Sequence, residues 1–315
     1  MKQHKSALVL GCGAVAGAAW QIPYLAEIKK QTGWDPASAE TFVGTSVGAV
    51  LVSLLAGGVS VETLLAAQQD MESVRKANPS CNWDHDVSTG PWYPPLPKFR
   101  FSGKQLFKLR KKLGLKAITA NCGLLPTGTF DMTPFRHLIG SIENQAGWLN
   151  HDDCRIMVAD NQTGERVALK SAQQANIKDA VCASYAVPGW CPPVEINGRT
   201  YLDGGIASPI SADILADSDI EVVHVLAPMA SWQPDASINP ATRIERRIRR
   251  GMTHTVNKEI EILKRAGKKV IALAPNAAEL KAIGFNMMDP GRRQRVFETS
   301  QQQAAAQVKQ ALANA

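Results

Sequence analysis

The chain has 315 residues, of which 45% are hydrophobic and 20% are charged, and its formal net charge is +7. This balance is typical of a globular protein and excludes wholesale disorder, collagen and coiled coil. The length suits one large domain or two small ones and is enough to bury a sizeable core. The positive charge is compatible with an anionic partner, lipid or nucleic acid, but does not select between them.

Six cysteines are spread along the chain, and no two of them form a C-x-x-C pair. A zinc ribbon and a thioredoxin-like redox site are therefore not expected, and no group of His, Cys or carboxylates has the spacing of a metal site. We expect free thiols in a reducing compartment and no bound metal.

Alternating strands and helices are predicted at the start of the chain. Residues 6–10 form an apolar run that ends in glycine, which predicts a buried strand, and residues 17–30 have helical spacing. A second apolar run at residues 41–43 precedes a sharp glycine turn and a helix over residues 49–56. This alternation predicts an α/β fold with a central, mostly parallel sheet flanked by helices.

The middle of the chain has a different composition. Residues 79–101 are rich in proline and aromatic residues and predict no regular element, whereas residues 102–105 resemble a capping box that opens a helix. Segment 87–130 contains no acidic residue and is locally basic. We expect residues 79–150 to form an excursion over the site, within a single domain that spans residues 1–315.

Regular elements are predicted again downstream. Extended stretches at residues 155–159 and 166–169 flank a tight turn and predict a hairpin. Further strands are predicted at residues 220–226 and 269–273, and helices at residues 241–266 and 290–314.

A cluster of arginines lies in the predicted helix at residues 241–266. Its members are Arg243, Arg246, Arg247, Arg249 and Arg250. We interpret them as a solvated helix face. The alternative is nucleic-acid binding, which is not expected because no recognition motif accompanies the cluster.

The first motif with chemical meaning is Gly44-x-Ser46-x-Gly48. A nucleophilic serine needs its Oγ exposed on a tight turn between a strand and a helix, and flanking glycines let the neighbouring chain come close. An apolar run precedes this motif and a helix of small residues follows it, which favours a nucleophile. A plain glycine-rich turn is the alternative.

The second motif is the loop from Gly11 to Gly17, directly after the first predicted strand. It fits a dinucleotide-binding loop poorly, because Ala16 occupies the position of the third glycine. We interpret it as an oxyanion hole, since small residues at a helix start leave backbone N–H groups bare. A phosphate-binding or simply packed turn is the alternative. The helix start also predicts a lowered thiol pKa for Cys12.

The third motif is Asp203-Gly204-Gly205. A carboxylate followed by two glycines can lie at a strand end, where Asp203 would accept the proton of Ser46. A tight turn capped by aspartate is the alternative.

Two histidines, His224 and His254, follow Asp203, so residue order alone leaves a Ser-Asp-His triad open. His224 lies in an apolar run, and we interpret it as a packed core residue. We interpret His254, in the basic helix, as solvated.

The order of the three motifs resembles that of the patatin-like phospholipases. In this chain a glycine-rich loop follows the first strand, G-x-S-x-G follows the second, and D-G-G lies well downstream. Residues 183–193 also resemble the approach of that family to its catalytic aspartate. The resemblance is close over residues 6–58 and 152–230 and loose between them.

The resemblance implies roles for individual residues. Ser46 would be the nucleophile and Asp203 the base of a Ser-Asp dyad. The amides of Cys12, Gly13 and Ala14 would form the oxyanion hole. The substrate would be a lipid ester, as in a phospholipase A or lysophospholipase, and the reaction would pass through an acyl-serine. No cofactor is implied.

The glycine-rich loop departs from the usual family pattern. Cys12 and Ala14 stand where glycines are usual, and Ala16 stands where an arginine is usual. Backbone donors survive these changes, but a position that needs a positive φ disfavours Cys or Ala. Two alternatives therefore stay open, namely a non-catalytic lipid- or membrane-binding protein and a serine esterase for another hydrophobic ester.

The N-terminal run also resembles a signal peptide. Its cleavage would remove the first strand and the oxyanion loop, so we expect a cytoplasmic protein. Segment 87–130 combines basic and aromatic residues, which favours peripheral contact with an anionic membrane. A core-packed insertion whose lysines are merely solvated is the alternative. The sequence leaves the oligomeric state open.

Overall fold

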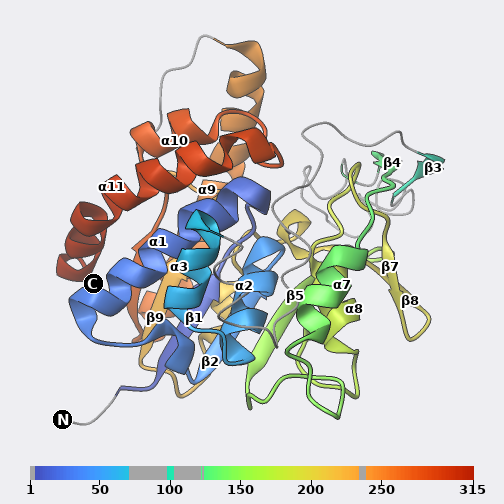
Figure 1. The fold of residues 1–315 in the computed structure, drawn as a ribbon, viewed down its shortest axis with the longest axis horizontal. Helices are drawn as coiled ribbons and strands as arrows, with labels where there is room; N and C mark the ends of the chain where they lie inside the picture. The colour runs from blue at the N-terminus through green and yellow to red at the C-terminus, as the bar shows by residue number, and fades with distance from the viewer. Residues whose placement is uncertain (1–3, 71–97, 103–121, 123, 234–238) are drawn as a thin grey trace.

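The computed structural model describes residues 4–70, 98–102, 122, 124–233 and 239–315. An eight-stranded sheet forms its centre (Figure 1). The strand order is β10 (Lys269–Leu273), β9 (Val222–Leu226), β1 (Ser6–Leu10), β2 (Thr41–Thr45), β5 (Cys154–Asp160), β8 (Arg199–Asp203) and β7 (Val194–Ile196), and β6 (Arg166–Leu169) pairs with β5.

Five neighbouring strands, from β10 to β5, are parallel to one another. The remaining strands, β6, β7 and β8, pair in antiparallel fashion. The predicted α/β fold with a mostly parallel sheet is therefore confirmed. The predicted hairpin is confirmed too, because β5 and β6 are antiparallel neighbours.

Helices cover both faces of the sheet. On one face lie α1 (Ala14–Thr32), α2 (Val47–Ala56), α8 (Ile177–Ser184) and α11 (Arg293–Ala313). Against these pack α3 (Val61–Gln69), α7 (Thr133–Gly140) and α10 (Ala277–Ile283). The other face is covered by α9 (Pro240–Arg265) and a 3-10 turn, Ala212–Leu215. The four predicted helices are confirmed, and α1 begins three residues earlier than expected.

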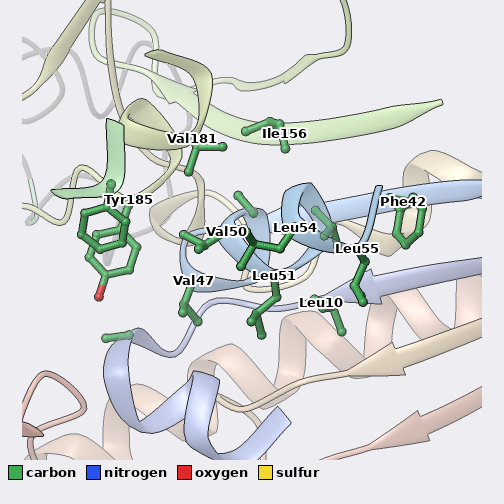
Figure 2. Packing of buried hydrophobic residues seen from close by; sticks show 14 of the residues in the cluster. Leu10, Phe42, Val47, Val50, Leu51, Leu54, Leu55, Ile156, Val181 and Tyr185 are labelled. Atoms are coloured by element: carbon green, nitrogen blue, oxygen red, sulfur yellow. The ribbon is translucent and has the colours of Figure 1, made fainter. Parts of the chain in front are cut away.

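Strand residues alternate between two hydrophobic cores, because successive side chains of a strand point to opposite faces. Leu10, Phe42 and Ile156 enter the core that α1 and α2 cover, and Figure 2 shows α2 packed over them. Val9 and Val43 enter the second core, beneath α9. Both faces of the central strands are thus buried, as their continuous apolar runs predict.

The middle of the chain is described in part. A small antiparallel pair joins β3 (Lys98–Phe101) to β4 (Pro126–Thr127), where the sequence predicted no regular element. The helix predicted from residue 102 and most of the basic segment 87–130 lie outside the described residues. Among the described residues, no helix is long and apolar enough to cross a membrane.

The start of α2 lies against the end of β1 at a distance that only glycine permits. A Cβ atom at Gly48 would lie 2.0 Å from the carbonyl oxygen of Leu10. One at Gly44 would lie 2.5 Å from a backbone atom of α2. Gly17 differs, because the nearest side chain would be 3.4 Å from its Cβ. The glycines of G-x-S-x-G are therefore required by close packing, and Gly17 is not.

We expect Gly48→Ala and Gly17→Ala to have opposite effects on stability. Gly48→Ala must push the backbone of β1 away and should lower the melting temperature strongly or prevent folding. Gly17→Ala should keep or raise it, because alanine favours a helix over glycine by about 1 kcal/mol. Thermal unfolding followed by circular dichroism makes the comparison, and equal melting temperatures would contradict the predicted close approach.

Candidate active site

Two consecutive residues of β5 bring Ser46 and Asp203 together. Thr45, the last residue of β2, pairs with Met157, and Asp203, the last residue of β8, pairs with Val158. Ser46 directly follows Thr45, and its side chain lies close enough to the Asp203 carboxylate to lower the pKa of that carboxyl. The sheet register therefore places two residues that are far apart in the sequence next to each other.

Ser46 has a backbone conformation that serine rarely adopts, with φ 58° and ψ −124°. Such a conformation persists only where its surroundings hold it. The Ser46 N–H donates to Ser184 Oγ at 2.8 Å, and Ser184 Oγ donates to the carbonyl oxygen of Met157 at 2.7 Å. Ser184 thus ties the strained turn to β5, and it leaves the Ser46 hydroxyl free for chemistry.

Asp203 is buried, and burial raises the pKa of its carboxyl from 3.8 to about 7. The nearby Ser46 hydroxyl and a hydrogen bond from the backbone of Gly205 lower this pKa and offset part of the effect. The Gly205 N–H donates to Asp203 Oδ1 at 2.7 Å. A Cβ atom at Gly204 would lie 2.4 Å from the Met157 carbonyl oxygen, and one at Gly205 would lie 2.9 Å from Asp203 Oδ1. The two glycines therefore let the carboxylate approach β5 closely.

The glycine-rich loop forms the start of α1, with Gly13 as its N-cap. No described residue accepts a hydrogen bond from the N–H groups of Gly13 and Ala14. Ala14 has φ 49°, in the left-handed region that the sequence analysis identified as unfavourable for alanine. These two amides are available to hold an oxyanion.

The expected role of the Cys12 amide is wrong. Its N–H already donates to the carbonyl oxygen of Pro209 at 2.9 Å, so it is not available to a substrate. The neighbouring Gly11 N–H is likewise used, by Leu226. The amides that could hold an oxyanion are thereby reduced to those of Gly13 and Ala14.

The expected lowering of the Cys12 thiol pKa is also wrong. Burial raises this pKa, and the negative charge of Asp203 raises it further, whereas Arg249 lowers it. The thiol packs close to Gly205, because a Cβ atom there would lie 2.9 Å from Cys12 Sγ. The helix start cannot compensate for the loss of water around the sulfur.

A cavity of about 520 Å³ contains Ser46, Asp203 and the Gly13–Ala14 amides. Two helices, α1 and α2, begin at its wall, and neither has a side chain that caps its N-terminus. Uncapped helix starts present bare N–H groups and favour negative charge. Apolar side chains form most of the remaining wall, namely Leu125, Val187, Trp190, Ile206, Met229, Ile244, Ile248, Met252, Phe285, Met287 and Met288.

The model of the patatin-like phospholipase family matches residues 8–216 of the chain. The chain belongs to this family. Its members are lipid hydrolases. The match includes both Ser46 and Asp203, whereas α9, α10 and α11 lie beyond it.

In this patatin-like protein no described histidine lines the cavity. His224 is buried in β9 and stacks on Trp34, with ring centroids 4.1 Å apart. Burial lowers the pKa of His224 to about 4. The packed-core interpretation of His224 is confirmed, and His254 is exposed, as expected. Neither histidine is placed to complete a triad.

The arginine cluster is solvated only in part, which corrects the sequence interpretation. Arg249 is buried, and its guanidinium pairs with Glu245 at 2.7 Å. It also donates to the carbonyl oxygens of Pro228 and Ala230. Arg246 pairs with Glu245 as well and donates to carbonyls at the end of α10. The exposed members are Arg243, Arg247 and Arg250.

Pro228 connects Arg249 to the glycine-rich loop. A Cβ atom at Gly13 would lie 2.8 Å from Pro228 Cβ, so the second residue after β9 packs directly on the start of α1. Arg249 thus anchors the support of this loop, while Ala16 stands where the family usually has an arginine. Sequence reasoning missed both Arg249 and Ser184, because their roles depend on contacts between distant segments.

We expect Ser184→Ala to impair the site more than Ser53→Ala does. Removal of Ser184 Oγ leaves the buried Ser46 N–H without an acceptor, which costs about 1–3 kcal/mol and frees the strained turn. Ser53, also buried and on α2, has an Oγ without a partner among the described residues, so its loss should change little. Turnover of a soluble ester and melting temperature are the measurements. Equal effects of the two substitutions would contradict the role of Ser184.

Proposed function

We propose that this protein is a serine hydrolase that cleaves carboxylic esters of lipids with a Ser46–Asp203 dyad. The observation that supports this most is the proximity of Ser46 and Asp203 beside two uncapped helix starts in one apolar cavity. The family match supports the broader assignment to lipid hydrolysis.

In the first half of the proposed reaction, the Asp203 carboxylate accepts the Ser46 proton while Oγ attacks the ester carbonyl carbon. The carbonyl oxygen becomes an oxyanion, which the N–H groups of Gly13 and Ala14 stabilise. When the bond to the leaving oxygen breaks, Asp203 returns the proton to that oxygen. The alcohol part of the lipid then leaves, and the acyl group stays on Ser46.

In the second half, Asp203 accepts a proton from a water molecule that attacks the acyl-serine. The same two amides hold the second oxyanion. Cleavage of the bond to Ser46 Oγ releases the fatty acid, and the proton on Asp203 restores the serine hydroxyl. A base with a pKa near 7 suits both directions of this proton transfer.

The cavity wall favours the acyl chain as the group that is recognised. Among the described lining residues there is no lysine or arginine that would bind a phosphate within the cavity. Apolar side chains can bury an acyl chain, and the polar head of the lipid would remain outside. The proposed activity is therefore of the phospholipase A or lysophospholipase type, with recognition directed mainly at the acyl group.

A fluorophosphonate probe, which modifies activated serines, tests the nucleophile. We expect the protein to be labelled and Ser46→Ala to abolish both labelling and hydrolysis of a soluble ester. Asp203→Asn should lose most turnover, because an amide cannot accept the serine proton. Ser53→Ala serves as the control and should label normally. Labelling of Ser46→Ala at the original rate would refute the nucleophile, and an unlabelled but lipid-binding protein would indicate a non-catalytic relative.

The pH dependence tests the base. Because Asp203 must be ionised to accept a proton, kcat/KM should rise with pH through about 7. A profile that is flat between about pH 5.5 and about pH 8.5 would contradict Asp203 as the base.

The same carboxyl should make folding less favourable as pH rises. Its pKa is about 7 when folded and 3.8 in the reference state, so only the unfolded chain is ionised between these values. The contribution of Asp203 to the stability of the folded state is therefore complete below pH 3.8 and is lost as the pH rises to about 7. Asp203→Asn should therefore raise the melting temperature by a few degrees at alkaline pH and much less under acidic conditions.

A further inference from the structure

An exposed apolar rim surrounds the mouth of the cavity that contains Ser46. Its four side chains line the cavity and are also open to solvent: Ile244 is 66% exposed, Ile248 41%, Phe285 45% and Leu125 41%. Large apolar side chains gathered at one exposed place mark a surface that contacts a partner or a lipid.

Three exposed arginines lie beside this rim on α9. Arg243, Arg247 and Arg250 are spaced four and three residues apart, so they share one face of the helix. Ile244 and Ile248 occupy the adjoining face, between the arginines and the cavity. None of the three arginines forms an ion pair with a described residue.

The charge of these arginines is not compensated nearby along the helix. Residues 239–258 contain a single acidic side chain, Glu245, which is buried and paired with Arg246 and Arg249. The exposed part of this segment is therefore positive, and it is complementary to an anionic surface.

We propose that the α9 surface, defined as Ile244, Ile248, Phe285 and Leu125 with Arg243, Arg247 and Arg250, docks the protein on an anionic phospholipid bilayer. This proposal rests on the proposed function, because the rim opens directly into the cavity that would take the acyl chain. The arginines contact headgroup phosphates, and the apolar side chains enter the interface. A lipid can then reach Ser46 along an apolar wall.

The position of the surface favours a bilayer over a protein partner. Whatever covers the rim also closes the entrance to the cavity, and a bilayer is a cover that can supply the substrate at the same time. Figure 1 shows the N-terminal end of α9 at the top of the view, beyond α10, and Ile244 and Ile248 near this end are exposed. This helix lies beyond the segment that matches the family model, whereas Leu125 lies within it.

Vesicle sedimentation tests the proposal, with Ser46→Ala as the parent so that binding is measured without turnover. We expect binding to vesicles of phosphatidylcholine with about 30% phosphatidylglycerol, weak binding to phosphatidylcholine alone, and weaker binding as salt rises. Joint reversal of Arg243, Arg247 and Arg250 to Glu should reduce partitioning about 100-fold, at roughly 5-fold for each arginine. Ile244→Asp should also weaken binding. With Ser46 present, the arginine triple variant should keep its labelling by the fluorophosphonate.

A matched control separates this surface from the overall positive charge. Joint reversal of Lys258, Lys264 and Arg265 to Glu makes the same change in charge at the exposed other end of α9, about 25 Å away. It should leave most of the vesicle binding intact. An equal loss in both triple variants, or unchanged binding of the Arg243/Arg247/Arg250 variant, would overturn the proposal.

Two further outcomes would assign the contact elsewhere and would also overturn the proposal. One is loss of vesicle binding only when Lys104, Lys108, Lys111 and Lys112 of segment 87–130 are reversed. The other is a dimer in solution that Ile244→Asp dissociates, because a second copy would then cover the rim. Failure of the probe to label Ser46 would refute the proposed function alone, since vesicle binding is measured on a variant without the nucleophile.

Discussion

The close approach of α2 to the end of β1 is the constraint on which the candidate site depends. Because Gly48 lies against the Leu10 carbonyl, the chain must turn sharply between β2 and α2, and Ser46 occupies the strained position of that turn. The same approach sets the start of α2 beside the start of α1. A nucleophile position and two bare helix starts therefore arise from one packing contact, and Ser184 holds the strained backbone in place from β5.

The raised pKa of Asp203 follows from burial, and none of the described residues supplies a cation that lowers it. The nearby Ser46 hydroxyl and the Gly205 N–H favour the ionised form of Asp203, but loss of water dominates and keeps its pKa near 7. Full neutralisation by an arginine would stabilise the carboxylate and weaken it as a base. Arg249 instead pairs with Glu245 and binds the carbonyls of Pro228 and Ala230. The Arg249 guanidinium holds the residues that support the glycine-rich loop, and Glu245 neutralises its charge. The pKa of Asp203 therefore stays raised.

Local patterns in the sequence predicted the alternation of strands and helices over the first 58 residues, several of the later strands and helices, and the two side chains that the sheet brings together. Such features depend on spacing within short segments, which a sequence displays directly. The errors concern contacts between distant segments. The Cys12 amide is occupied by Pro209, and Arg249 is buried by the chain after β9, although a run of arginines resembles a solvated face. The Cys12 thiol shows the same limit, because burial depends on tertiary packing and outweighs the helix start.

One helix links the interior of the site to its surroundings. On its buried side, α9 contributes Glu245 and Arg249, which fix the residues that support the glycine-rich loop. On its exposed side, the same two turns present Ile244 and Ile248 at the cavity mouth. Exposed Ile244 and Ile248 directly precede buried Glu245 and Arg249 in the sequence. The same stretch of α9 therefore forms both the cavity mouth and the ion pair that holds Pro228.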